Sequence, residues 1–280
     1  MTTLPTVGIL HPGSMGAAIA GCAAAHASSV LWCPTGRSPA SVSRAQEFGL
    51  VAVDSMRELL DRSDIVISLC PPAAAEELAS EVARVGFSGV YVEANAISPE
   101  RTHRIAAMIN LTGSVVDGGV VGNPPVGGMT PMLYLSGPPS LTAKVEGLFS
   151  GTDVHTKAVG EAVGQASALK LSFAAFQKVS RVLVALSYGL AREHGVDQEL
   201  RDISAWLAGS FLAQPEYTAQ AAARAWRWGP EMNEIGDALE QAGLPPEILR
   251  GAAAALARWD GVKDDSSLTW GAALDRLARP

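Results

Sequence analysis

Charged side chains are scarce in this sequence and absent from its beginning. Asp, Glu, Lys and Arg make up 18% of the 280 residues, below the roughly 25% typical of soluble domains. None of them occurs from Met1 to Gly36, and the first formal charge is Arg37. Uncharged side chains must therefore build much of the surface or of an interface, which favours burial against a second chain.

The sequence also lacks the segments that direct a chain into or across a membrane. No basic stretch precedes the apolar N-terminal residues, and proline and polar residues interrupt them well before the ~20 apolar residues of a membrane span. The three cysteines, Cys22, Cys33 and Cys70, have no CxxC spacing, which indicates reduced thiols rather than disulfides or a zinc site. We therefore expect a cytoplasmic protein.

Basic clusters are missing as well. The 28 Asp and Glu residues outnumber the 21 Lys and Arg residues, giving a net charge of −7, and the two signs are interspersed. This pattern argues against nucleic acid and anionic membranes as partners. The five histidines show no metal-ligand spacing, and no GxSxG or Cys/His arrangement is present. Neither a metal site nor a nucleophilic enzyme is predicted.

Short β-rich runs alternate with helical stretches in the first half of the chain. The runs are Thr6–Leu10, Ser29–Cys33, Ile65–Leu69, Val90–Glu93 and Ser114–Val116, with helical stretches such as Met15–Ala27 and Ala40–Phe48 between them. This alternation predicts a parallel sheet covered by helices on both faces, in which the first strand and helix are buried.

After about Gly160 only helices are predicted. A long helix runs from Glu161 to about His194, and further breaks divide the remainder into shorter helices. These breaks lie at Gly195, Gln214-Pro215, Gly229-Pro230, Gly243 to Pro246 and Gly261. We predict an α/β domain over residues 1–160 and an all-α domain over residues 161–280, joined by the long interdomain helix.

A glycine-containing loop follows the first predicted strand and opens the first helix. It reads His11-Pro12-Gly13-Ser14-Met15-Gly16, the dinucleotide-binding fingerprint with His11 in place of the first glycine. Gly13 lets the backbone approach a pyrophosphate, Gly16 lets the helix pack on the sheet, and the helix N-terminus supplies N–H groups. The motif predicts a Rossmann cofactor site formed by His11, Pro12, Gly13, Ser14 and Met15. The alternative is an ordinary tight strand-to-helix turn.

The end of the second strand indicates which dinucleotide is bound. NAD-binding proteins of this fold carry an acidic residue there for the ribose hydroxyls, whereas this sequence has Cys33. Thr35, Arg37 and Ser38 follow, a cation and two hydroxyls suited to a 2′-phosphate. We predict NADP(H) as the cofactor. The alternative is that Arg37 is a solvated loop residue.

Together these motifs resemble the β-hydroxyacid dehydrogenase superfamily, which includes 3-hydroxyisobutyrate dehydrogenase, 6-phosphogluconate dehydrogenase and the imine reductases. The resemblance runs through the whole chain, from VGILHPGSMGAAIA and GRSPAS to a C-terminal segment, Arg224–Ile235, similar to a phosphogluconate dehydrogenase-like branch. Cys70 and Pro71 lie where the family lines the nicotinamide pocket. Asn95, in the segment EANAISP, lies at the asparagine position of phosphogluconate dehydrogenases.

The resemblance also implies substrate and catalytic residues. The segment Asp117–Asn123 is similar to the family's substrate-binding segment, with Val121 and Asn123 replacing its usual serine and second glycine. Lys170 occupies the position of the catalytic lysine, while Ala174 replaces the asparagine four residues later. The implied function is an NADP(H)-dependent oxidoreductase that acts on a small hydroxy acid or its oxo form.

The residues themselves support these roles and leave alternatives open. Lys170 has apolar neighbours, so its amine is expected to be partly desolvated and to exchange a proton with the substrate oxygen; otherwise its stem covers apolar surface and its head reaches solvent. Asn95 binds the substrate or the nicotinamide, or it caps the helix after Pro99. Gly122 and Asn123 offer N–H groups to a substrate carboxylate, or they form a rigid turn.

Trp226, Trp228 and Glu231 are predicted to form an aromatic and acidic cluster in the helical domain. The resemblance implies a homodimer in which the long helices of two subunits pack together. In such a dimer Trp226 and Glu231 would close the substrate site of the partner subunit. Core packing is the alternative for the tryptophans.

Two other functions compete with hydroxy-acid oxidoreduction. NADPH-dependent imine reduction is favoured by Ala174 and by the apolar Val121, but imine reductases usually carry an acidic residue or tyrosine where this sequence has Lys170. A non-catalytic NADPH-binding sensor would use the helical domain for partner binding. The retention of Lys170 argues against it.

Overall fold

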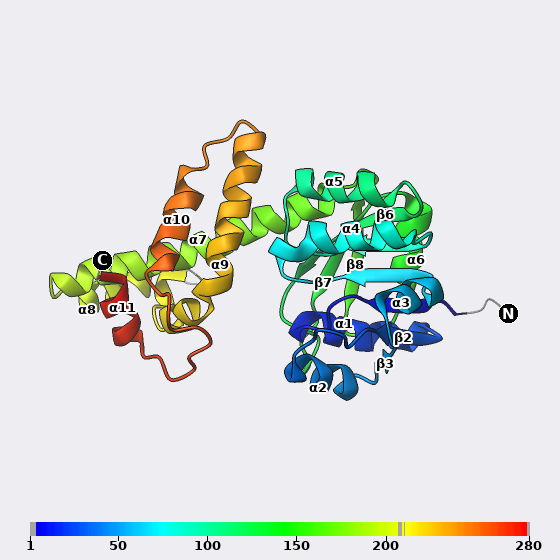
Figure 1. Cartoon of the computed structure of the whole chain (residues 1–280). Coiled ribbons are helices and arrows are strands. Elements are labelled where there is room, and N and C mark those ends of the chain that lie inside the picture. The colour runs from blue at the N-terminus through cyan, green and yellow to red at the C-terminus, as the bar shows by residue number, and fades with distance from the viewer. Residues whose placement is uncertain (1–3, 207–208, 210, 279–280) are drawn as a thin grey trace. The chain divides into compact units, whose positions relative to one another are not determined.

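The computed structural model describes residues 4–206, 209 and 211–278. Contacts divide the chain into two units, residues 1–171 and residues 172–280, and the helix α7 (Gln165–Glu193) contributes to both. Within the described residues, every strand lies in the first unit, and the second unit is built from helices (Figure 1).

The first unit alternates strands and helices, as the sequence predicts. Its strands are β1 (Thr6–Ile9), β2 (Ser29–Trp32), β3 (Val51–Ala52), β4 (Ile65–Ser68), β5 (Val90–Glu93), β6 (Ser114–Val121), β7 (Met132–Ser136) and β8 (His155–Gly160). Its helices before α7 are α1 (Ser14–Ala23), α2 (Pro39–Glu47), α3 (Met56–Arg62), α4 (Ala75–Val85), α5 (Pro99–Ile109) and α6 (Pro139–Gly147). All five predicted strands are present, within one residue of the predicted ends except that β6 continues beyond Val116.

The eight strands form one sheet in the order β3-β2-β1-β4-β5-β6-β7-β8. All neighbours pair in parallel except β6 and β7. The five predicted strands pair in parallel, as expected, and the antiparallel strand β7 is one that the sequence did not predict. The connection 122–131 between β6 and β7 is short and rich in glycine and proline, without the helix that usually returns a chain to a parallel strand, so the strand turns back antiparallel.

Alternating residues of the strands face two hydrophobic layers. On one face, Val7, Val30 and Ile65 join a core with side chains of α1, α2 and α6. On the other face, Leu31 and Val66 join a core with side chains of α3, α4 and α5. The sheet is thus covered on both sides, which accounts for the apolar character of its central strands (Figure 1).

The long helix begins later than predicted, at Gln165 instead of Glu161. Gly164 has a φ of 98°, which is outside the helical region and which side chains other than glycine rarely adopt. The chain therefore turns at this glycine before the helix starts. The predicted C-terminal end, near His194, agrees with the observed end at Glu193.

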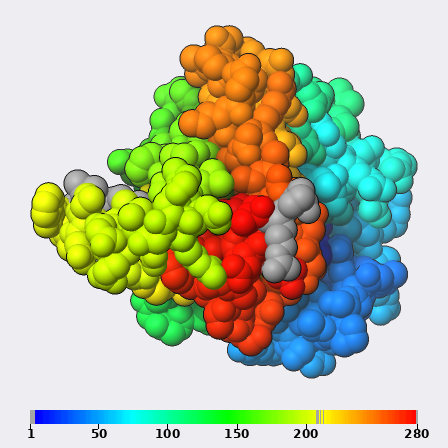
Figure 2. Space-filling model, turned by 90° about the vertical axis from the view of Figure 1, so that its left-hand side faces the viewer, coloured from blue at the N-terminus to red at the C-terminus, as the bar shows by residue number. Residues whose placement is uncertain are grey.

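Among the described residues, the second unit contains the rest of α7, a short 3₁₀ helix (Phe211–Ala213) and four more α-helices. These are α8 (Asp197–Ser204), α9 (Tyr217–Gln241), α10 (Glu247–Ala257) and α11 (Trp270–Ala278). Helices α9 and α10 pack against each other, and α11 contacts α9. Figure 2 shows α10, α11 and the C-terminal part of α7 at the surface of this unit.

The predicted break at Gly229-Pro230 is wrong, because α9 runs through both residues. Proline removes one helical hydrogen bond, a cost of about 3 kcal/mol in a helix interior. Buried side chains nevertheless continue on both sides of it, with Trp228 5% exposed and Met232 fully buried. Their burial offsets the loss.

Among the described residues, no helix combines the length and apolar character needed to cross a bilayer.

Candidate functional site

The carboxyl ends of β1, β4, β5 and β6 meet at one edge of the sheet, where ligands bind in open α/β folds. Four groups of predicted site residues lie there. They are the loop His11–Gly13 with Ser14 and Met15, the pair Cys70 and Pro71, Asn95, and the segment Val121–Asn123. The structure therefore brings these residues to a common edge.

The loop after β1 leaves the N-terminus of α1 open. Gly13 is the N-cap residue of α1 and has extended backbone angles, no side chain caps the helix, and its first turn contains no acidic residue. A Cβ atom on Gly16 would lie 2.4 Å from the His11 carbonyl oxygen, so only glycine fits beneath the loop. The helix thus presents uncapped N–H groups and positive potential to a bound anion.

Two arginines reach this loop from the segment after β2. The Arg37 guanidinium donates to the Leu10 carbonyl oxygen (2.8 Å) and lies 2.8 Å from His11 Nδ1, while Arg44 Nε donates to the Pro12 carbonyl oxygen (3.3 Å). Within the described part of the chain, neither guanidinium has a carboxylate partner, and Arg37 Nε is buried without a hydrogen bond. Two uncompensated cations therefore adjoin the open helix end.

Arg44 is absent from the sequence prediction. It lies on α2, and its contact with Pro12, 32 residues away along the chain, leaves no local signal in the sequence. Ser38 is the N-cap of α2, where its Oγ accepts a hydrogen bond from the Ser41 amide (3.3 Å), and Thr35 is exposed beside it. Both predicted hydroxyls thus lie close to Arg37 along the chain.

Asn95 is almost fully buried, and its carboxamide bonds within the protein. Its Oδ1 accepts the Cys70 amide (2.6 Å), and its Nδ2 donates to Ser68 Oγ (3.0 Å) and to Glu93 Oε1 (2.5 Å). The alternative that Asn95 caps the next helix is wrong, because Ser98 is the N-cap of α5. Asn95 thus ties the end of β5 to the segment after β4.

Glu93 has no exposed surface, and only one of its carboxyl oxygens has a partner in the described residues. Oε1 accepts both the backbone amide (3.0 Å) and the side-chain amide of Asn95. Burial raises the pKa of the Glu93 carboxyl to about 8, although the hydrogen bonds from Asn95 oppose this effect. At neutral pH Glu93 is therefore largely a neutral acid. Burial likewise raises the pKa of the Cys70 thiol to about 11, so this thiol is not a nucleophile.

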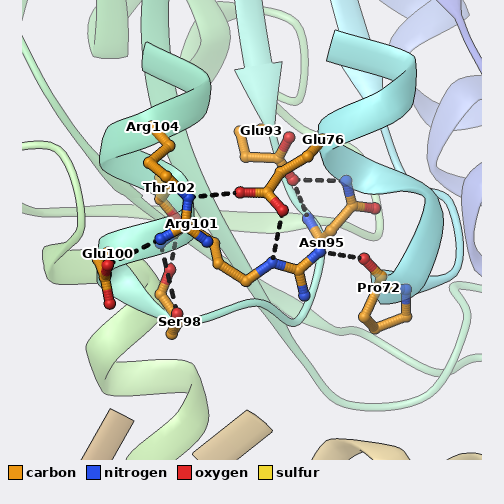
Figure 3. Close-up of polar contacts among 9 residues, drawn as sticks. All are labelled: Pro72, Glu76, Glu93, Asn95, Ser98, Glu100, Arg101, Thr102 and Arg104. Carbon is orange, nitrogen blue, oxygen red and sulfur yellow. Dashed lines mark hydrogen bonds and ion pairs between the residues drawn. The ribbon is translucent and has the colours of Figure 1, made fainter. Parts of the chain in front are cut away.

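The other end of the Cys70 segment is held from α5 (Figure 3). Arg101 donates to the Pro72 carbonyl oxygen (2.8 Å) and pairs with Glu76 (3.3 Å), which also pairs with Arg104 (2.7 Å). Residues 70–72, including the exposed Pro71, are thus fixed at both ends. A segment held in this way presents a rigid edge to a ligand.

Asp117 anchors the first turn of α7 to the sheet. This fully buried carboxylate on β6 accepts the amides of Gly164 (2.9 Å) and Ser167 (3.0 Å) at Oδ2 and the Ser167 hydroxyl (2.6 Å) at Oδ1. Ser136 supports the same turn by donating to Asp117 and accepting the Ala166 amide. From the sequence, Asp117 is expected only as the first residue of the substrate-binding segment. Its anchoring role depends on Gly164 and Ser167, which are 47 and 50 residues away along the chain and give no local signal.

This anchoring places Lys170 against β6. A Cβ atom on Gly119 would lie 3.0 Å from Lys170 Cβ and 2.7 Å from the Ala166 carbonyl oxygen. Helix α7 therefore packs directly against the backbone of β6 at this glycine. Lys170 is half-buried, and β6 ends just beyond Gly119 at the half-buried Val121 and the exposed Gly122 and Asn123. The first unit therefore brings Lys170 together with the predicted substrate segment.

Trp226 and Glu231 both lie on α9 but have different surroundings. Glu231 is buried and pairs with Lys178 of α7, whose Nζ lies 5.6 Å from the Trp228 ring. Trp226 is 43% exposed and donates to Asp264 (3.2 Å). Five residues along a helix correspond to about 140° of rotation, so the predicted single cluster is divided. Lys178 is the member that the sequence analysis missed.

No group of three or more potential metal ligands occurs among the described residues.

Two segments of the chain match known protein families. Residues 6–92 match the family described as "NADP oxidoreductase coenzyme F420-dependent", and residues 191–259 match a "Domain of unknown function (DUF1932)". An uncharacterized 28.5 kDa protein from Methanothermus fervidus is 28% identical over 174 residues, covering 62% of this chain and 66% of that protein, just under two thirds of its length.

Solved structures share the fold. The 3-hydroxyisobutyrate dehydrogenase of Mycobacterium tuberculosis, solved with L-serine, has a TM-score of 0.76 at 18% identity, covering 99% of this chain and 100% of that one. The imine reductase from Pseudomonas sp. has a TM-score of 0.56 at 18% identity, covering 98% and 100%. The expected structural similarity to hydroxyacid dehydrogenases and imine reductases is therefore confirmed, as is the α/β domain followed by a helical region.

Proposed function

We propose that this protein is an NADP(H)-dependent oxidoreductase acting on a small hydroxy acid or its oxo form. The observation that carries the proposal is the convergence, at one sheet edge, of an uncapped helix N-terminus, two unpaired arginines and Lys170. The family description matched by residues 6–92, which names NADP, supports the choice of cofactor.

The residues of the loop fit a dinucleotide. Gly13 and the open end of α1 would receive the pyrophosphate through backbone N–H groups, and Arg37, whose guanidinium has no carboxylate partner in the described residues, would receive a 2′-phosphate. Thr35 and Ser38 would add hydroxyl groups. The fixed segment at Cys70 and Pro71 would border the nicotinamide, positioned by Asn95.

A nicotinamide cofactor supplies hydride transfer when bound, and the proton is left to the protein. Lys170 would give a proton to the substrate oxygen during reduction, or accept the hydroxyl proton during oxidation. Asp117 fixes the turn that carries Lys170, and Val121, Gly122 and Asn123 lie beside it for a substrate carboxylate. In the second unit, Trp226 and Glu231 remain proposed substrate residues.

Imine reduction is the second candidate. Its support is the fold shared with the Pseudomonas imine reductase and two apolar residues, Val121 at the end of β6 and Ala174 four residues after Lys170. Turnover of NADPH with a panel of oxo acids, ketones and cyclic imines separates the two. We expect oxo acids to be reduced. Selective turnover of cyclic imines would replace the first proposal by the second.

The role of Lys170 is tested by Lys170→Ala, with Lys144→Ala as a matched control because Lys144 is exposed on α6. Loss of general acid catalysis should lower kcat by about 10²- to 10⁴-fold and leave NADPH affinity within about twofold. Unchanged kcat would overturn the assignment. NADPH binding by the parent without turnover of any panel member would favour the non-catalytic sensor.

We further propose a homodimer formed through the helical unit. Phe176, Leu183 and Leu190 of α7 are 69%, 51% and 66% exposed and recur every seven residues, so they form one apolar stripe. Heptad spacing is the pattern by which two helices pack along their length. A second copy of α7 is the partner that this stripe fits.

A further inference from the structure

His11 stands where the dinucleotide fingerprint has its first glycine, and its side chain lies along the loop. A Cβ atom on Gly13 would be 3.3 Å from His11 Cδ2, and the imidazole is half-buried. The ring therefore lies in contact with the loop that would receive the cofactor phosphates. A glycine at this position would leave that space empty.

The contact with Arg37 defines the protonation state of this histidine. His11 Nδ1 lies 2.8 Å from Arg37 Nη1, and a guanidinium has only N–H donors. Nδ1 must therefore accept the hydrogen bond, which places the proton of a neutral imidazole on Nε2. Burial lowers the pKa of His11, and the charges of Arg37 and Arg44 lower it further. The first turn of α1 adds no acidic residue that would oppose them.

Two acceptors thus hold the Arg37 guanidinium over the loop. One is His11 Nδ1 and the other is the Leu10 carbonyl oxygen (2.8 Å). A long side chain from the segment after β2 would otherwise sample many rotamers, and fixing it in advance favours ligand binding. Arg37 Nε has no partner in the described residues, so the protein alone does not satisfy every donor of this guanidinium.

We propose that His11 is a specificity-determining residue that positions Arg37 for the phosphate ester on the adenosine ribose. The inference rests on the proposed function, because it takes NADP(H) as the ligand. According to this proposal, His11, which replaces the first glycine of the fingerprint, contributes selectivity for the 2′-phosphate. It acts through Arg37 and not through contact with the reacting atoms.

The test uses two nucleotides that differ only by this phosphate, adenosine 2′,5′-bisphosphate and adenosine 5′-monophosphate. Each is titrated calorimetrically into the full chain at pH 8, where His11 is neutral. His11→Gly restores the usual residue of the motif, so the turn should be preserved. In His11→Asn, the side-chain oxygen Oδ1 is bonded to Cγ, as Nδ1 is in histidine, so an acceptor for Arg37 is kept at the same position.

We expect His11→Gly to weaken bisphosphate binding about tenfold, the size of one hydrogen bond to a charged group. Monophosphate binding should stay within about twofold of the parent, and His11→Asn should recover most of the bisphosphate affinity. In an Arg37→Ala background, His11→Gly should have no further effect, since the two residues act as a unit. Arg84→Ala removes an exposed charge at the opposite edge of the sheet and should change neither affinity.

An equal loss for both nucleotides, or additive effects of His11→Gly and Arg37→Ala, would overturn the inference and leave the proposed cofactor intact. A parent chain that binds the two nucleotides equally well would overturn the choice of NADP(H), and the inference with it. The two failures are therefore distinguishable.

Discussion

Two fully buried carboxyl groups at the candidate site differ in how they are satisfied. Asp117 accepts hydrogen bonds at both oxygens from the start of α7 and from Ser136, whereas Glu93 accepts at Oε1 only. A buried carboxyl oxygen without a hydrogen-bond donor favours the neutral form of its group. Asp117 therefore acts as an anchor for a helix, and Glu93 as a neutral acid that orients Asn95.

The raised pKa of Glu93 predicts how stability changes with pH. The native carboxyl loses its proton near pH 8, whereas the ordinary value is 4.5. Between these values the native chain holds a proton that the unfolded chain has released, so Glu93 makes stability fall as pH rises. Glu93→Gln keeps the acceptor for Asn95 but cannot ionise.

Urea unfolding of the Glu93→Gln variant and the parent from pH 5 to pH 8 measures this effect. The free energy of unfolding of the variant relative to the parent should rise with pH, with a slope approaching about 1.4 kcal/mol per pH unit. Parallel stability curves for the two proteins would contradict the assignment of a neutral Glu93.

Removal of the Asp117 anchor should destabilise the first unit. Asp117→Ala leaves the buried amides of Gly164 and Ser167 without acceptors, at about 3–5 kcal/mol in the free energy of unfolding. Asp117→Asn keeps one carbonyl oxygen and should cost less. Asp61→Ala removes an exposed acid on α3 as a control. Equal stability of Asp117→Ala and the control would refute the anchoring role.

The residues predicted from sequence are those whose roles depend on neighbours along the chain. The loop from His11 to Gly16 and Lys170 have local patterns. Arg44 and Lys178 have none, because their roles come from Pro12 and Glu231, which are distant in sequence. For Asn95, the sequence places it correctly at the sheet edge, but its partners Ser68 and Cys70 become its neighbours only when β4 and β5 pair.

At the scale of elements, strong apolar runs identify strands and weak ones do not. The central strands β1, β2, β4 and β5 are short apolar runs and are predicted within one residue. Strand β8 contains His155 and Lys157, is largely exposed and lies at the edge of the sheet, so it has no such signal. The missed β7 pairs antiparallel to β6, a direction decided by the short connection between them.

Helix α9 continues through Pro230, although proline disfavours the interior of a helix, because buried side chains pack on both sides of it. Pro230→Ala restores one backbone N–H in the middle of the helix, so the second unit should gain about 1–2 kcal/mol in the free energy of unfolding. Pro139 lies in the first turn of α6, where no N–H is required, so Pro139→Ala should bring no such gain. A destabilised Pro230→Ala would contradict this explanation.

At the scale of the whole molecule, the low charge of the sequence has two explanations. The uncharged beginning forms β1, the loop, α1 and β2, of which most side chains are buried, and charge returns at Arg37, beside the open end of α1. The second explanation is the apolar stripe of α7, formed by Phe176, Leu183 and Leu190. Its exposed leucine and phenylalanine side chains are the surface that the proposed dimer would cover.

Leu183→Glu tests the dimer by placing a charge in the centre of this stripe. Sedimentation of the parent should give a dimer, and the variant should be a monomer with an unchanged far-ultraviolet spectrum. Leu111→Glu is the matched control, because Leu111 is 84% exposed in the first unit and outside the stripe. A monomeric parent, or a Leu183→Glu variant that stays dimeric, would contradict the proposed interface.

The central claim is that the open end of α1 and Arg37 together bind NADP(H), and fluorescence titration of the parent and Arg37→Ala with NADPH and NADH tests it most directly. The account predicts that the parent binds NADPH at least about tenfold more tightly than NADH and that Arg37→Ala loses this preference while still binding NADH. Equal affinity of the parent for the two cofactors, or binding of neither, would contradict it.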